Sequence, residues 1–298
     1  MRLPSESVMI GSEMDSELTG RTADLIVCAA LGDPMSTARY EGLCAGNANS
    51  QVLGVAVCYA PTLDLLRRAA AEKKNLIVAR EHPYFLHGGL YYSYGTDGLE
   101  AAMRDDPVVR AKREIINAHQ LMVYRYASAW DQFQPKAQSL ALAQALGLRP
   151  RPSAPTDRSR GVVCDVQRST LTVLAQTAAD RLKAFSPRTV GDPASSVSRV
   201  AVLAGETDPT PALARLLADP RIDGVIAGAG GTVDEVDGAI AYFQDLRASG
   251  RKIAMLAIGH LASEAPGCAE MAKWLHGVFP ALSVEYWETA DPSWIPRS

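Results

Sequence analysis

Two short segments, far apart in the sequence, carry imidazole and carboxylate side chains suited to binding metal ions. Residues 80–83 (Arg-Glu-His-Pro) follow the apolar run 76–79, and residues 259–264 (Gly-His-Leu-Ala-Ser-Glu) follow the apolar run 253–258. Together with Asp131 they supply two imidazoles and three carboxylates. Nitrogen and oxygen donors of this kind bind divalent metals, and pairs of such ions catalyse hydrolysis. We therefore expect a two-metal hydrolytic centre, which requires these segments to converge in the fold.

The spacing within each segment permits two interpretations. His260 and Glu264 are four residues apart, so on a helix they share one face and can bind a metal ion together. Alternatively, they are simply the first turn of a helix, where Glu264 interacts favourably with the positive end of the helix dipole. Glu81 and His82 stand at a predicted strand end, where side chains of open α/β sheets point into the ligand crevice. Consecutive strand residues face opposite ways, so each could serve a different ion. The alternative is an ordinary charged strand end that Pro83 closes.

Apolar runs alternate with helical patterns along most of the chain, which indicates an α/β fold. The runs 53–59 and 76–79 are separated by one predicted helix, the pattern of a βαβ unit with a buried parallel sheet. By the same criteria we predict strands at 120–126, 161–166, 200–204, 224–227, 253–258 and 281–287, and helices at 105–119, 136–146, 169–185, 211–217, 233–248 and 263–275.

Residues 149–160 are rich in Pro, Ser and Arg without hydrophobic periodicity, which is typical of a linker. We therefore predict two α/β domains with mainly parallel or mixed sheets covered by helices. The metal-site domain comprises residues 1–149 plus 253–298, and residues 150–252 form a second, inserted α/β domain.

Composition favours a globular enzyme for small molecules. The chain has 298 residues, 47% of them hydrophobic, and a net charge of -3, which offers no basic surface for nucleic acid. No apolar stretch approaches the ~18 residues of a membrane span, and the first residues lack the apolar core of a secretory signal. The five cysteines have no CxxC spacing and suggest buried thiols in a reducing compartment. We expect a cytoplasmic protein without nucleic-acid or membrane partners.

Four segments, in order, resemble the Nif-three-like dinuclear-metal family, also labelled GTP cyclohydrolase I type 2. Its typical segments are an early Gly-Leu stretch, an apolar strand ending His-His-Pro, a His-Thr-x-x-Asp segment and a late Gly-His-x-x-Ser-Glu. This chain has Gly42-Leu43, Glu81-His82-Pro83, residues 127–131 (Ala-Ser-Ala-Trp-Asp) and residues 259–264 in that order. The likeness extends over most of the chain from about residue 40. It implies a Nif-three-like fold and a ring-like homohexamer.

The resemblance also implies a ligand set for two divalent ions (Fe, Mn or Zn). Carried over by position, the ligands are Glu81, His82, Asp131, His260 and Glu264. The catalytic residues implied are Glu81, Asp131 and Glu264, of which Asp131 and Glu264 are candidates for bridging carboxylates.

Two positions depart from the family pattern. Glu81 replaces the first His of His-His-Pro, and Ala127 replaces the His of His-Thr-x-x-Asp. Glu81 can still ligate a metal, whereas Ala127 removes a polar group near the site. Without cations, three converging carboxylates would repel one another and destabilise the fold, so we expect a chelator to lower stability.

The function implied is a metal-dependent hydrolase that attacks a C–N bond of a small heterocyclic or nucleotide-like substrate through a metal-bridging hydroxide. One alternative is a non-catalytic metal-binding regulatory or scaffold protein of the same fold, since Ala127 can mark lost activity. Another is a single-metal enzyme that uses His82, His260 and one carboxylate as a facial triad.

Overall fold

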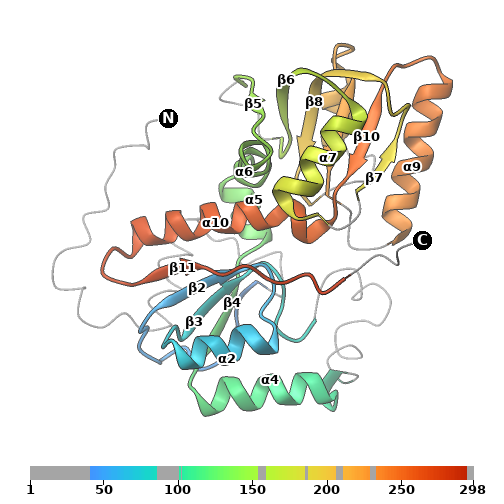
Figure 1. The fold of residues 1–298 in the computed structure, drawn as a ribbon. Helices are drawn as coiled ribbons and strands as arrows, with labels where there is room; N and C mark the ends of the chain where they lie inside the picture. The colour runs from blue at the N-terminus through green and yellow to red at the C-terminus, as the bar shows by residue number, and fades with distance from the viewer. Residues whose placement is uncertain are drawn as a thin grey trace.

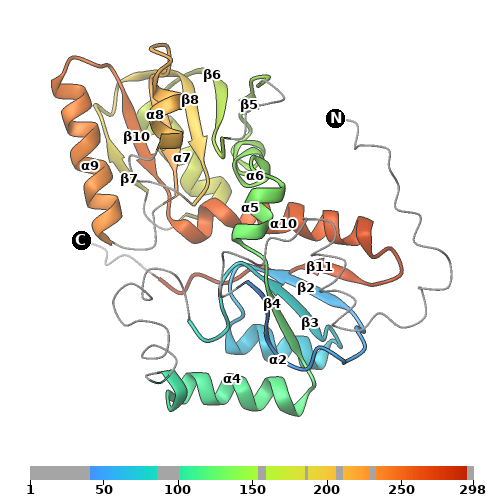
Figure 2. The same cartoon turned by 180° about the vertical axis from the view of Figure 1, so that it is seen from behind.

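The computed structural model describes residues 41–85, 101, 103–153, 159–184, 187–205, 211–228 and 233–293. The described strands form two sheets, and the long helix α10 (His260–Val278) runs between them (Figure 1). The view from behind shows the same order of layers (Figure 2). This arrangement confirms the predicted α/β class with two helix-covered sheets.

The first sheet has the strand order β1-β4-β3-β2-β11. Its central strands β2 (Val55–Cys58), β3 (Leu76–Ala79) and β4 (Met122–Arg125) are parallel, as is β11 (Val284–Tyr286), whereas β1 (Gly42–Ala45) is antiparallel to β4. All residues of β2 and β3 are buried, because helices cover both faces.

Alternate residues of these strands build two cores. Val55 and Val57 pack with Met271 and Leu275 of α10, whereas Ala56 packs on the opposite face. That opposite core contains residues of α2 (Leu63–Ala71) and α4 (Pro107–Ala118). The period of two in the strands therefore fixes which helix lies on which face.

The second sheet is mixed, with the strand order β5-β6-β8-β9-β10-β7. The strands β8, β9 and β10 are parallel to one another, and the others pair antiparallel. The six strands are β5 (Arg149–Pro150), β6 (Val162–Thr170), β7 (Arg188–Val190), β8 (Ser196–Leu203), β9 (Gly224–Ala227) and β10 (Ala254–Ala257).

Four helices cover this second sheet. One core contains residues of α6 (Ala137–Ala145) and α7 (Leu171–Leu182), and the other contains residues of α8 (Pro211–Leu217) and α9 (Val233–Ala248). The helix α6 also packs along α10 and so connects the two halves of the molecule.

Most predicted elements are present, and the strand β1 and the helix α5 (Ser128–Phe133) are additional elements that were not predicted. Other differences are local. The helix α10 begins at His260 rather than near residue 263, because Gly259 adopts a φ of 93° that starts the helix without a side-chain cap. The strand β7 falls between the predicted helix 169–185 and the predicted strand 200–204, and β5 lies at the start of the predicted linker.

The sheets also bear on the predicted division of the chain. The strands β6 to β9 lie within the predicted inserted domain, but β10 pairs in the same sheet although it begins beyond residue 252. The domain boundaries themselves stay a prediction.

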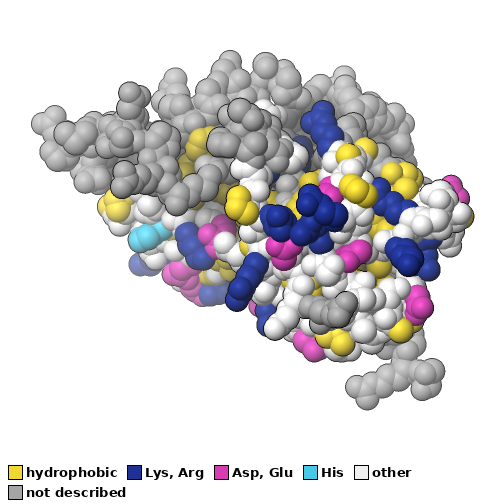
Figure 3. Space-filling view, turned by 90° about the horizontal axis from the view of Figure 1, so that it is seen from above, with side chains coloured by type: hydrophobic (Ala, Val, Ile, Leu, Met, Phe, Trp, Pro, Cys, Tyr) yellow, Lys and Arg dark blue, Asp and Glu magenta, His cyan; other side chains and the backbone are white. Residues whose placement is uncertain are grey.

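Charged side chains on the outside of the second sheet are paired by opposite sign. Arg151 and Arg199 both contact Asp165, at 2.7 Å and 3.1 Å. On the face in Figure 3, basic and acidic side chains lie beside one another rather than gathering by sign. Among the described residues, no helix is long and apolar enough to cross a membrane.

Candidate functional site

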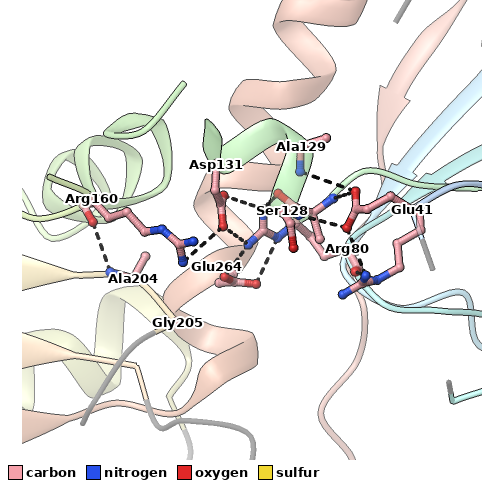
Figure 4. A network of polar contacts seen from close by, with 12 residues as sticks. Glu41, Arg80, Ser128, Ala129, Asp131, Arg160, Ala204, Gly205 and Glu264 are labelled. Carbon is pink, nitrogen blue, oxygen red and sulfur yellow. Dashed lines mark hydrogen bonds and ion pairs between the residues drawn. The ribbon is translucent and has the colours of Figure 1, made fainter. Parts of the chain in front are cut away.

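The predicted site residues lie where the two sheets meet, close to the carboxyl ends of several parallel strands. Arg80 and Glu81 directly follow β3, and Asp131 lies in the short helix α5 (Ser128–Phe133) that follows β4. His260 and Glu264 occupy the first two turns of α10. Figure 4 shows Asp131 and Glu264 pointing toward one guanidinium group, that of Arg80. In open α/β sheets this edge is where ligands bind.

All five N–H donors of the Arg80 side chain have an acceptor. Nε and Nη2 donate to Oε2 and Oε1 of Glu264 at 3.0 Å and 2.6 Å. Nη1 and Nη2 donate to Oδ1 and Oδ2 of Asp131 at 2.8 Å and 3.2 Å. The second hydrogen of Nη1 points to the carbonyl oxygen of Ala127 at 3.2 Å. Each carboxylate is thus engaged through both of its oxygens, which is the strongest geometry available to an arginine.

These ion pairs fix the charge of the buried groups. Burial raises the pKa of Glu264, but the charge of Arg80 and the hydrogen bond with His260 outweigh it and lower that pKa to about 2. Burial opposes the charged form of Arg80, and the charges of Glu264 and Asp131 nevertheless raise its pKa. Glu264 is therefore an anion and Arg80 a cation at neutral pH.

The side chain of His260 is more accessible than those of Arg80, Asp131 and Glu264. Its Nε2 lies 3.4 Å from Oε2 of Glu264, and a third of its side chain (33%) is exposed. Burial lowers the pKa of His260, but the hydrogen bond and charge of Glu264, with a contribution from Glu81, give a net increase. The ring of Tyr59 meets the imidazole edge-on, with centroids 5.7 Å apart.

Glu81 lies near this same group of side chains, next to Tyr59. Burial, followed by the negative charges of Glu81 and Glu264, raises the pKa of the Tyr59 phenol. The two carboxylates therefore flank Tyr59 and His260, and both favour the protonated forms of these groups.

His82 faces a different environment. Its side chain is buried, and Nδ1 accepts a hydrogen bond from the backbone N–H of Tyr84 at 3.1 Å. Burial, with the positive charges of Arg125 and Lys112, lowers the pKa of His82 to about 3. His82 is therefore neutral at pH 7, and it contacts Tyr84 through this hydrogen bond and an edge-on ring contact with centroids 5.7 Å apart.

Glu41 positions the segment that carries Asp131. Its carboxylate accepts hydrogen bonds from the backbone N–H groups of Ala127 and Ser128 at 3.0 Å and 2.9 Å, and from Nη1 of Arg125 at 2.9 Å. A carboxylate at a helix beginning satisfies free N–H groups and complements the dipole.

Two glycines bring the second sheet against α10. Gly205 has a φ of 76°, and a Cβ atom there would lie 2.6 Å from Oε1 of Glu264. The Gly205 N–H donates to Oγ of Ser263 at 3.0 Å, and that hydroxyl donates to the carbonyl oxygen of His260 at 2.8 Å. A Cβ atom at Gly228 would lie 2.5 Å from the same Oγ. Only residues without a side chain permit this close approach.

The predicted donors, as arranged, do not fit a pair of divalent ions. A metal bound by Asp131 and Glu264 needs carboxylate lone pairs that face a shared space, and the Arg80 guanidinium fills that space and uses all four oxygens. In the part of the chain that the structure describes, no group of three or more His, Cys, Asp or Glu side chains is arranged to hold a metal ion.

This fold and site define an α/β protein with a charged centre between two sheets, and sequence comparison names the family. The sequence profile described as Duf34/NIF3 (NGG1p interacting factor 3) matches residues 35–292, so the chain belongs to that family. This confirms the resemblance noted in the sequence.

Solved structures show the same fold. A hypothetical protein from Staphylococcus aureus, SA1388, is 17% identical with a TM-score of 0.65, covering 94% of this chain and 100% of its own. A Bacillus cereus protein related to NIF3 is 14% identical with a TM-score of 0.64, covering 94% and 99%. TTHA1606 from Thermus thermophilus is 15% identical with a TM-score of 0.60, covering 93% and 99%. No protein with a curated description matches the sequence.

Sequence reasoning missed the roles of Arg80 and Glu41. Arg80 directly precedes the Glu81-His82-Pro83 motif. A charged residue immediately after a fully buried strand could have indicated its role. Glu41 gave no comparable signal, because its partners lie more than 80 residues away in the sequence.

Proposed function

We propose that this chain is a hydrolase that cleaves a C–N bond of a small heterocyclic or nucleotide-like substrate at the junction of its two sheets. The observation that carries the proposal is that Arg80 binds Glu264 and Glu264 contacts His260, whose imidazole is partly exposed. Membership of the Duf34/NIF3 family supports the fold and the location of the site, and the substrate class rests on the resemblance to cyclohydrolases.

The residues present can move protons as such a reaction requires. Glu264, held as an anion by Arg80, orients the imidazole of His260 and stabilises its protonated form. His260 then removes a proton from the attacking water and returns it to the leaving nitrogen, so that the hydroxyl ends on carbon and the proton on nitrogen. Tyr59 and Glu81 border His260, and we assign them to substrate positioning.

A metal-dependent form of the same hydrolysis, with two divalent ions (Fe, Mn or Zn), would require Arg80 to release Asp131 and Glu264. We therefore derive no step through metal ions. Elemental analysis of anaerobically purified protein measures whether ions are bound.

Replacement of His260 tests the proposed reaction. In a screen of cyclic amides and of purine and pyrimidine derivatives, we expect turnover by the wild type and a loss of about 10²-fold or more in His260→Gln, because a positioned acid–base group contributes that much. The control is His276→Gln, an exposed histidine in the last turn of the same helix, which should keep full activity. Equal activity of His260→Gln and wild type would refute the role of His260.

The second candidate is a non-catalytic regulatory or scaffold protein of the same fold. It is favoured by the replacement of a family histidine by Ala127, which has no side-chain group that can transfer a proton. A folded wild-type protein that turns over no compound in the screen would favour this candidate. In either case we propose a cytoplasmic homohexamer without nucleic-acid or membrane partners, whose mass light scattering can measure.

A further inference from the structure

Two carboxylates beside Arg80 are largely buried in the fold. The side chains of Asp131 and Glu264 are only 12% and 6% exposed, and both lie against Arg80. Buried carboxylates of this kind need a cation close by, since otherwise they repel one another and become protonated. In a metalloprotein that cation is a metal ion, whereas in this chain the cation is part of the polypeptide.

Arg80 is built into this position by its backbone as well as by its side chain. Its N–H donates to the carbonyl oxygen of Tyr59 at 3.1 Å, and its carbonyl oxygen accepts from Nε of Arg125 at 2.9 Å. The side chain is 5% exposed and has all five donors satisfied. Moving the guanidinium away from the carboxylates would therefore break several buried hydrogen bonds.

Two neighbouring residues agree with this arrangement. At position 127, where the family pattern has histidine, alanine has no polar side chain, and its backbone oxygen accepts from Nη1 of Arg80. Arg160 brings a second guanidinium to within 3.8 Å of Oδ2 of Asp131, with 47% of its side chain exposed. The cluster therefore already holds positive charge close to both carboxylates.

We propose that Arg80 takes the place of the metal ions in this chain, which makes its site metal-independent. The guanidinium pairs with both Asp131 and Glu264, joins α5 to α10, and fills the space that an ion bridging these carboxylates would need. Its single positive charge is supplemented by Arg160 beside Asp131 and by His260 beside Glu264. The inference does not depend on the proposed reaction, because it concerns what holds the site together.

The wild-type protein provides the first test. After treatment with a chelator, the protein is incubated anaerobically with Mn²⁺, Fe²⁺ or Zn²⁺, separated from free ions by gel filtration, and subjected to elemental analysis and thermal unfolding. We expect well below one ion per chain and an unfolding temperature that neither chelator nor metal changes. Two ions retained per chain, or a marked fall in unfolding temperature with chelator, would overturn the proposal whether or not the protein is a hydrolase.

The variant Arg80→Ala provides the second test. It leaves the two carboxylates facing an empty space, so we expect a lower unfolding temperature that Mn²⁺ or Zn²⁺ raises again, together with at least one bound ion per chain. The double variant Arg80→Ala with Glu264→Gln should lose this rescue. Arg160→Ala is the matched control, since it removes the more exposed guanidinium near Asp131 and should create no metal site.

If Arg80→Ala does not fold, Arg80→Gln keeps a polar side chain for the same comparison, and the wild-type measurement decides independently. An Arg80→Ala protein as stable as the wild type, in the absence of metal, would contradict the proposal.

Discussion

Arg80 pairs with and aligns two carboxylates, and the energetic consequence depends on their burial. A surface ion pair contributes roughly 0–1 kcal/mol, whereas breaking a buried pair by removing one partner costs about 3–5 kcal/mol, because an uncompensated charge stays behind. The pairs of Arg80 with Asp131 and Glu264 belong to the buried kind. The guanidinium therefore stabilises the site mainly by preventing the carboxylates from being left unpaired.

Gly205 tests how rigidly this pairing holds Glu264. In Gly205→Ala the new Cβ atom would lie 2.6 Å from Oε1 of Glu264, which Arg80 keeps in place, at a residue with a φ of 76°. We expect a loss of about 2–4 kcal/mol in the free energy of unfolding, from backbone strain and steric overlap together, measured by urea denaturation.

The matched control for this prediction is Gly250→Ala. Gly250 also has a positive φ, 93°, but a Cβ atom there would meet nothing within 4 Å. Gly250→Ala should therefore lower the free energy of unfolding by only about 1–2 kcal/mol, from backbone strain alone. Equal losses in the two variants would show that Glu264 moves freely and would weaken the case for a fixed Arg80 pair.

At the scale of elements, α10 organises the site because it contacts both halves of the molecule. Its first two turns carry His260 and Glu264, and its later turns pack on β2 of the first sheet and along α6. The contact with α6 is close at Gly267, where a Cβ atom would overlap the side-chain amide of Gln138. Gln138 is buried. With its side-chain amide in the orientation that matches donors to acceptors, the nitrogen donates to the backbone oxygen of Glu264 at 3.2 Å.

The contact between α6 and α10 can be measured with a double-mutant cycle. Gly267→Ala should cost about 1–3 kcal/mol of stability, because it displaces the Gln138 side chain from a packed contact. In the background of Gln138→Ala the same change should cost much less, so the two substitutions should couple. Gly277→Ala, at a position in the same helix with nothing within 4 Å, should be neutral or stabilising by up to about 1 kcal/mol. Absence of coupling between positions 267 and 138 would contradict this description.

The elements were predictable where local patterns determine them. The apolar run 224–227 and the helical pattern 233–248 appear in the structure with the predicted bounds, as β9 and α9. The short strand β7 was not predictable in this way, because Arg188–Val190 carries little apolar periodicity and is a strand only through pairing with β10.

At the scale of the whole molecule, the chain brings together the ends of strands from two sheets. The carboxyl ends of β3, β4, β8 and β9 all lie near the beginning of α10, through Arg80, Asp131, Gly205 and Gly228. A crevice at such strand ends is the common ligand site of α/β proteins. The family fold therefore determines where the candidate site lies, and the residues of this chain determine its charges.

This convergence also explains what the sequence could not reveal. Arg80 contacts Asp131 and Glu264, which are 51 and 184 residues away, so its partners are set by tertiary structure alone. The same motif predicted His82 as a ligand, and only the folded chain shows that it accepts a hydrogen bond from Tyr84 and that Arg125 and Lys112 help to lower its pKa. Residue types identified the region of the site, but the pairing of charges required coordinates.

The most direct measurement is X-ray diffraction from wild-type crystals grown with Mn²⁺ or Zn²⁺, with data collected at the absorption edge of the metal. We predict density for the Arg80 guanidinium between Asp131 and Glu264, and no anomalous peak at that position. An anomalous peak bound by these two carboxylates, with the Arg80 side chain turned away, would contradict the central claim that an arginine takes the place of the metal ions.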